Sequence, residues 1–70
     1  MIIMLPSNKS IKLENIQSID EVYLTDYPDV FTEFYYVLKV NYHNDDPIYL
    51  FYLTKNQAEI DRNYLLNKIN

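Results

Sequence analysis

The chain has 70 residues, of which 49% are hydrophobic and 16% aromatic, and it contains no cysteine. A chain this short forms one domain that buries roughly 60% of its unfolded surface, and without cysteine it has neither disulfides nor thiolate zinc sites. The net charge of −4 disfavours binding to phosphate backbones or anionic lipid and favours a basic partner. We therefore expect residues 1–70 to form a single domain, stabilised by close packing or by self-association.

The N-terminal residues predict two short strands. Residues 2–5 are apolar and stop at Pro6, and farther along Ile11 and Leu13 alternate with Lys12, as in a strand with one buried face. The first apolar stretch is too short to cross a membrane and lacks a basic flank, so it predicts neither a membrane span nor a signal peptide. We expect a cytoplasmic protein that does not bind membranes.

Residues 16–24 fit two interpretations. The apolar positions are three apart at first and two apart at the end, so this stretch fits a helical turn or a strand. We favour a strand over about 17–24 with a bulge near Asp20 and Glu21, because no helix cap precedes it. Residues 25–29 contain a proline between polar residues and predict a turn.

The chain is organised around a predicted β-hairpin. Residues 34–43 and 48–53 are rich in aromatic and β-branched side chains, and the Asn, Asp and Pro residues of 44–47 predict the turn between them. If this turn is a four-residue loop, His43 pairs with Ile48, and every other pair follows because strand pairing has a period of two. One face of the hairpin is then wholly apolar and forms the core. It consists of Phe34, Tyr36, Leu38, Val40, Tyr42, Tyr49, Phe51 and Leu53.

The opposite face of the predicted hairpin is mixed. Its side chains are Tyr35, Val37, Lys39, Asn41, His43, Ile48, Leu50 and Tyr52. A sheet face in contact with water normally carries polar residues, so the apolar members of this set need cover from the chain or from a partner.

The C-terminal residues predict a helix over about 55–68. Residues 54–57 fit a capping box, in which the Thr54 hydroxyl accepts a hydrogen bond from the Gln57 amide. Helical spacing places one stripe of side chains on the hairpin core and leaves Ile60 and Tyr64 on the far side. The stripe consists of Ala58, Arg62, Leu65, Leu66 and Ile69.

These elements predict an α+β fold. We expect a small antiparallel β-meander of four to five strands with one C-terminal α-helix packed on one face. The alternative is a partly rolled sheet, like half of a small barrel.

Residue types that carry chemistry are present but not arranged for it. His43 is the single histidine and follows a strand, where a turn residue is more common than a general base. The aspartates of the two turns lack the spacing of a calcium loop, and Asp is favoured in turns by its own hydrogen bonding. We expect no catalytic residue, no metal and no cofactor, because a sheet of this size offers no deep cleft for paired carboxylates.

Aromatic residues on the mixed face raise the possibility of base stacking. Tyr35 and Tyr52, with Lys39 nearby, could hold single-stranded bases. The basic residues form no run, however, and the net charge repels phosphates. We therefore expect a cation–π pair between Lys39 and Tyr52 and no direct contact with nucleic acid.

The surplus of apolar surface predicts a non-enzymatic protein-interaction module. Tyrosines suit such a role because they bury a large rigid area and carry a polar tip, and acidic side chains around them attract a basic protein surface. The expected partner-binding residues are Tyr35, Val37, Lys39, Ile48, Leu50, Tyr52, Ile60, Tyr64, Asp20, Glu21, Asp26, Asp29 and Glu33.

Two kinds of partner are compatible with these surfaces. In size, charge and frequent use of Asn, Ile, Lys and Tyr, the chain resembles small acidic proteins of AT-rich phages that block a host enzyme or defence complex, including anti-CRISPR inhibitors. This resemblance implies inhibition by covering a surface of a larger, possibly nucleic-acid-handling, protein. The alternative is a homodimer that serves as a structural or accessory module, with the same patches joining two copies.

Overall fold

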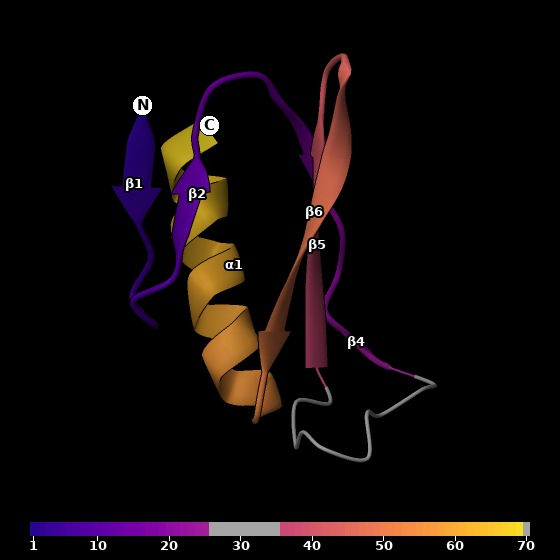
Figure 1. Cartoon of the computed structure of the whole chain (residues 1–70). Helices are drawn as coiled ribbons and strands as arrows, with labels where there is room; N and C mark the ends of the chain where they lie inside the picture. Colours follow the sequence, from indigo (N-terminus) through magenta and orange to yellow (C-terminus); the bar gives the residue numbers. More distant parts are fainter. Residues whose placement is uncertain (26–35, 70) are drawn as a thin grey trace.

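The computed structural model describes residues 1–25 and 36–69, which form two antiparallel sheets and one helix (Figure 1). These elements are β1 (Ile2–Met4), β2 (Ser10–Lys12), β3 (Ile16–Ile19), β4 (Tyr23–Leu24), β5 (Tyr36–Tyr42), β6 (Asp45–Tyr52) and α1 (Lys55–Ile69). The predicted α+β class, with a C-terminal helix on antiparallel strands, is confirmed. No helix in this part of the chain is long and apolar enough to cross a membrane.

The main sheet is built around β5. Strands β3 and β4 pair with one edge of β5, and β6 pairs with its other edge, all antiparallel. Strands β1 and β2 form a separate hairpin, which lies beside α1 and the main sheet (Figure 1). The predicted strand over 17–24 is interrupted: β3 ends at Ile19, and residues 20–22 connect it to β4.

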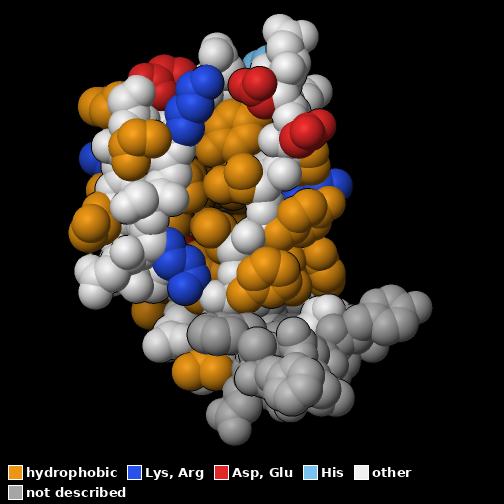
Figure 2. All heavy atoms as spheres, in the orientation of Figure 1, with side chains coloured by type: hydrophobic (Ala, Val, Ile, Leu, Met, Phe, Trp, Pro, Cys, Tyr) orange, Lys and Arg blue, Asp and Glu red, His pale blue; other side chains and the backbone are white. Residues whose placement is uncertain are grey.

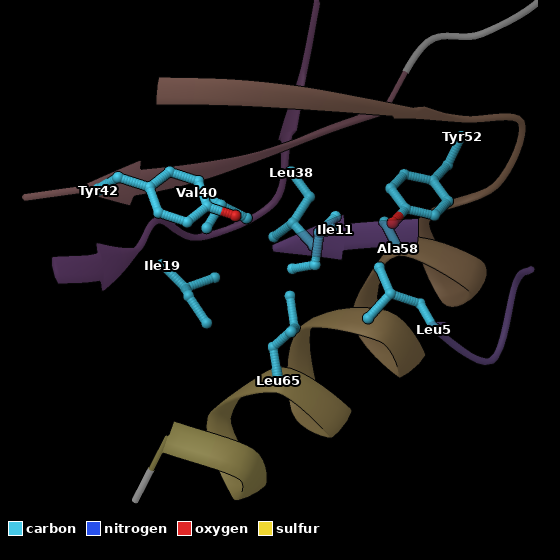
Figure 3. Packing of buried hydrophobic residues seen from close by; sticks show 9 residues of the cluster. All are labelled: Leu5, Ile11, Ile19, Leu38, Val40, Tyr42, Tyr52, Ala58 and Leu65. Atoms are coloured by element: carbon cyan, nitrogen blue, oxygen red, sulfur yellow. The ribbon is translucent and has the colours of Figure 1, made fainter. Parts of the chain in front are cut away.

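One core joins the hairpin, the main sheet and the helix. The buried side chains come from all three parts and converge between them (Figure 3). Each large apolar side chain buried there contributes about 1.5–3 kcal/mol to the free energy of unfolding. The cluster consists of Leu5, Ile11, Ile19, Leu38, Val40, Tyr42, Tyr52, Ala58 and Leu65.

The predicted register of the central hairpin is wrong. Ile48 pairs with Val40, not with His43, and the last pair before the turn is Tyr42 with Asp45. The shift of β6 against β5 is three residues, an odd number, so the face of β5 that points to the core is as predicted and that of β6 is inverted.

The physical reason is a two-residue turn together with a β-bulge next to it. Asn44 adopts a φ of 64°, a left-handed conformation that asparagine tolerates better than most residues. The chain therefore reverses earlier than a four-residue loop allows, and Asp45 and Pro47 become part of β6. This turn alone would shift the pairing by four residues and would leave the faces of β6 as predicted, but a β-bulge between the pairs Val40–Ile48 and Tyr42–Asp45 makes the shift three. As a result Tyr52 is buried, with only 2% of its surface exposed, whereas Phe51 is 47% exposed.

The helix follows the prediction closely. It spans Lys55–Ile69, and the backbone N–H of Gln57 donates to Thr54 Oγ1 at 3.2 Å, which is the N-cap bond of the predicted capping box. Ala58 and Leu65 are buried as predicted, but the most buried polar side chain of the helix is Asp61, which the predicted stripe did not contain.

Candidate functional site

The predicted partner-binding residues of the central hairpin do not form one surface. Val37 and Tyr52 are buried, so the prediction that they are exposed is wrong. Ile48 and Leu50 lie on the core face of β6, where they are partly buried against the core. The inverted face of β6 explains Ile48, Leu50 and Tyr52 alike.

The remaining predicted residues are spread over the molecule. Ile60 is exposed on α1, whereas Tyr64 is half-buried and lies 5.3 Å from the Lys68 ammonium, measured to the ring centre. Asp20 and Glu21 are exposed in the link between β3 and β4. The predicted residues outside the described part of the chain are Tyr35, Asp26, Asp29 and Glu33.

The outer face of the main sheet, opposite the core, carries exposed aromatic side chains. Tyr23, Val37 and Phe51 form one cross-strand row, and Lys39 and Tyr49 form the next. Tyr49 and Phe51 are each 47% exposed and Tyr23 is 44% exposed. The Lys39 ammonium lies 5.7 Å from the Tyr49 ring centre, so the predicted cation–π pair forms with Tyr49 instead of Tyr52, because the register is shifted.

The outer face ends in a polar cluster. The Asn41 side-chain amide donates to Ser18 Oγ at 3.1 Å and to Asp20 Oδ1 at 3.0 Å. The Arg62 Nε donates to the backbone carbonyl of Asp20 at 3.0 Å. These bonds hold the link between β3 and β4 against β5 and the helix, and they keep the carboxylate of Asp20 at the rim of the aromatic rows.

Further apolar side chains are exposed where β6 meets the start of α1. Phe51, Leu53 and Ile60 are each close to half exposed. Together with Pro6 they line one side of a pocket of roughly 370 Å³ between the β1–β2 turn, the end of β6 and the helix. We call Tyr49, Phe51, Leu53 and Ile60 the edge patch, because they follow the outer edge of β6 onto the helix.

The deepest polar group beside this pocket is the carboxylate of Asp61, which is 0% exposed. It accepts hydrogen bonds from the Ser7 backbone N–H at 3.1 Å, from Ser7 Oγ and from the Tyr52 hydroxyl at 2.7 Å. The Lys9 ammonium lies 5.0 Å from the Tyr52 ring centre. These contacts connect the β1–β2 turn, β6 and α1, so the role of the cluster is structural.

The sequence contains a signal for the burial of Asp61. Ala58, Asp61 and Leu65 follow each other at helical spacings of three and four residues, so Asp61 falls on the same stripe as two buried residues. A carboxylate on such a stripe needs donors from elsewhere in the fold, because a buried polar group without hydrogen bonds is costly. Ser7 and Tyr52 provide them.

Two buried tyrosines have pKa values above the usual range. Burial raises the pKa of Tyr52, and the hydrogen bond to Asp61 and the negative charge of Asp61 raise it further. Burial also raises the pKa of Tyr42, whose hydroxyl donates to the backbone carbonyl of Lys12 at 2.6 Å.

We expect these tyrosines to make the fold sensitive to alkali. In the unfolded chain a tyrosine ionises near pH 10, before Tyr52 and Tyr42 do so in the folded chain, so stability is retained below about pH 10 and falls as the pH rises above it. Urea denaturation at about pH 8 and about pH 11 should show this loss. Tyr52→Phe should reduce the pH dependence, whereas Tyr49→Phe, at an exposed position, should leave it intact. An unchanged pH dependence in Tyr52→Phe would contradict the assignment.

Of the turn residues with possible metal-binding or acid–base side chains, those of residues 43–46 lie in the described part of the chain. His43 is exposed in the turn, and Asp45 lies 3.8 Å from the Lys12 ammonium. Within residues 1–25 and 36–69, no three His, Asp or Glu side chains are grouped so as to hold a metal ion. No protein-family model, curated protein or solved structure matches the chain, so only the geometry and chemistry of its own surfaces bear on its function.

Proposed function

We propose that the chain is a non-enzymatic protein-binding module that acts by covering a surface of a larger, basic protein, as small acidic inhibitors do. The observation that carries this proposal is the edge patch. Tyr49 and Phe51 are the aromatic centre of that patch, and both are almost half exposed although the chain also has a well-packed core. Exposed aromatic side chains of this kind supply most of the free energy at protein interfaces.

The distribution of charge supports a basic partner. The chain carries a net charge of −4. Asp20 and Glu21 are exposed in the link between β3 and β4, on one edge of the main sheet, and Asp45 and Asp46 are exposed at the start of β6, on the other edge. A basic surface would approach this molecule faster than a neutral one, because opposite charges steer the encounter.

A variant of the edge patch tests the proposal. We expect Tyr49→Ser together with Phe51→Ser to leave the fold intact and to weaken capture of the partner by at least about tenfold, because two aromatic contacts are lost. The matched control is Met4→Ser together with Ile69→Ser, which removes exposed apolar side chains outside the patch. The measurement is affinity capture from lysate of the source organism, quantified by mass spectrometry for wild type and both variants.

Two results would contradict this function. Capture of the same proteins by the edge-patch variant and by wild type would show that the patch is not the binding surface. A tight homodimer at low micromolar concentration, lost in the edge-patch variant when its mass in solution is measured, would assign the patch to self-association and support a structural module instead.

A further inference from the structure

Strand β6 has a free edge. Strand β5 pairs with one side of β6, and within the described part of the chain no strand pairs with the other side. The Asp20 N–H donates to the carbonyl of Lys39 at 3.0 Å. The N–H and C=O groups of odd-numbered residues in β5 therefore point away from β6, and those of even-numbered residues point toward β6. In β6, Tyr49 and Phe51 therefore direct their N–H and C=O groups to the free edge. Pro47 has the same parity, where its missing N–H costs no ladder bond.

Strand β2 has a second free edge, which is turned toward the main sheet. The Leu13 N–H donates to the Met1 carbonyl at 3.0 Å. The N–H and C=O groups of odd-numbered residues in β2 therefore bond to β1, and those of Ser10 and Lys12 point away from the hairpin. The outward carbonyl of Lys12 accepts the hydroxyl of Tyr42 from β5 at 2.6 Å. This bond fixes the direction of the β2 edge.

The two edges are too far apart to pair with each other. No Cα atom of β2 lies within 8 Å of a Cα atom of β6, whereas paired strands are about 4.8 Å apart. Two such spacings, about 9.6 Å, are what one additional strand between β2 and β6 would need. The separation therefore excludes direct pairing and is compatible with a single inserted strand.

The space between the edges is a groove with an apolar floor. One pocket of about 370 Å³ lies beside Ile11, Tyr42 and Ile48, and another of about 370 Å³ lies beside Phe51 and Leu53. Both are bounded by the β1–β2 hairpin on one side and by β6 on the other. Figure 2 shows this face of the molecule, with hydrophobic side chains visible in the hollow between the hairpin and β6.

From these observations, and resting on the proposed protein-binding function, we propose that an extended segment of the partner inserts between β2 and β6 and adds as an antiparallel strand to β6. The guest strand bonds to the free N–H and C=O groups of Tyr49 and Phe51 and to those of Ser10. Its inward side chains contact Ile11 and Ile48. It joins the two sheets into one, and its outer face continues the edge patch.

The β1–β2 hairpin leaves no room in the groove for a second folded copy of this chain. An edge strand of another sheet brings a neighbouring strand with it, and that neighbour would collide with β2. A single extended segment has no such neighbour.

Asp46 at the end of the groove sets the chemistry of the segment. Asp45 and Asp46 are both exposed at the beginning of β6, but Asp45 lies 3.8 Å from the Lys12 ammonium on the other side of the groove, so Asp46 supplies the unbalanced negative charge. A guest antiparallel to β6 places its C-terminal end there, so we expect Lys or Arg at that end and apolar residues at alternate positions before it.

A displayed library of random dodecapeptides is the probe that tests the groove. Peptides enriched on the wild-type protein should show the alternating apolar pattern with a basic C-terminal end. We expect Tyr49→Pro to weaken their binding by roughly three- to tenfold, because proline removes one N–H at the free edge. Tyr49→Ala, which keeps that N–H and removes the aromatic ring from the outer face, should bind the peptides almost as wild type does.

A second pair of variants does not depend on proline being tolerated. Asp46→Lys should weaken the enriched peptides by about tenfold because it reverses the charge at the end of the groove. Glu21→Lys makes the same change in charge away from the groove and should have little effect.

Amide hydrogen exchange of the wild-type protein gives a third readout. Without peptide, the amides of Tyr49 and Phe51 should exchange much faster than those of Ile48 and Leu50. An enriched peptide should slow the exchange of Tyr49 and Phe51 at least about tenfold.

The outcomes separate this inference from the proposed function. Loss of peptide binding in Tyr49→Pro or Asp46→Lys, with protection of the Tyr49 and Phe51 amides, supports strand addition. Failure to enrich peptides, or peptides that bind all variants equally without protecting these amides, overturns it. In that case the protein-binding function still stands if capture of the partner depends on the side chains of Tyr49 and Phe51, and it falls separately if capture does not.

Discussion

Asp61→Ala is expected to lower the free energy of unfolding by about 3–5 kcal/mol, because it removes the acceptor of buried hydrogen bonds that cost about 1.5–3 kcal/mol each when broken. The Tyr52 hydroxyl would remain in the core without a partner, and the β1–β2 turn would lose both bonds from Ser7. A domain of 70 residues has a total of roughly 4–10 kcal/mol. The variant should therefore be largely unfolded or close to it, which urea denaturation followed by circular dichroism would show.

Controls on the same helix separate this effect from a change in helix propensity. Asn63→Ala, at an exposed position of α1, should change stability by less than about 0.5 kcal/mol. Asp61→Asn keeps an acceptor for the Tyr52 hydroxyl and should fall between Asp61→Ala and wild type. Equal stability of Asp61→Ala and wild type would mean that the cluster does not hold the hairpin to the sheet and the helix.

Tyr52→Ala should destabilise the domain by about 3–5 kcal/mol, as large-to-small changes of buried aromatic residues do. Its neighbour Phe51 points to the outer face of the sheet, so Phe51→Ala should cost less than about 1 kcal/mol. The two residues are adjacent and similar in size, and only the register of β6 makes one structural and the other available for binding. Chemical denaturation of the two variants side by side measures this difference.

The opposite ranking of the two variants would restore the register expected from the sequence. In that register Phe51 faces Val40 in the core and Tyr52 lies outside. If Phe51→Ala is unfolded in the denaturation experiment and Tyr52→Ala is not, the pairing of Val40 with Ile48 is excluded.

Local sequence determined the elements whose signals are short-range. The helix is predicted from the Thr54 cap and from the spacing of Ala58 and Leu65. The core face of β5 is predicted because Leu38 and Val40 alternate with Lys39 along one strand. Such patterns depend on residues that are close in the chain, so they survive whatever the rest of the fold does.

The surplus of apolar surface was also readable from the sequence, but its location was not. The aromatic content predicts that some large side chains remain exposed, and Tyr49 and Phe51 are exposed in the folded chain. The residues expected in that role from the sequence included Tyr52, which is in the core. The composition decided how much apolar surface is left over, and the pairing of the strands decided which residues carry it.

Only the tertiary structure decided the register of β6, the cluster around Asp61 and the groove beside β2. A turn of two residues and a turn of four are both compatible with residues 43–47, and the φ of 64° at Asn44 belongs to the shorter one. The β-bulge between Val40 and Tyr42 that accompanies the shorter turn then exchanges the two faces of a whole strand. Asp61 is buried because Ser7, which is 54 positions away, supplies donors that no local pattern reveals. The groove exists because two strand edges, each unremarkable in the sequence, are held more than 8 Å apart by side-chain contacts between distant parts of the chain.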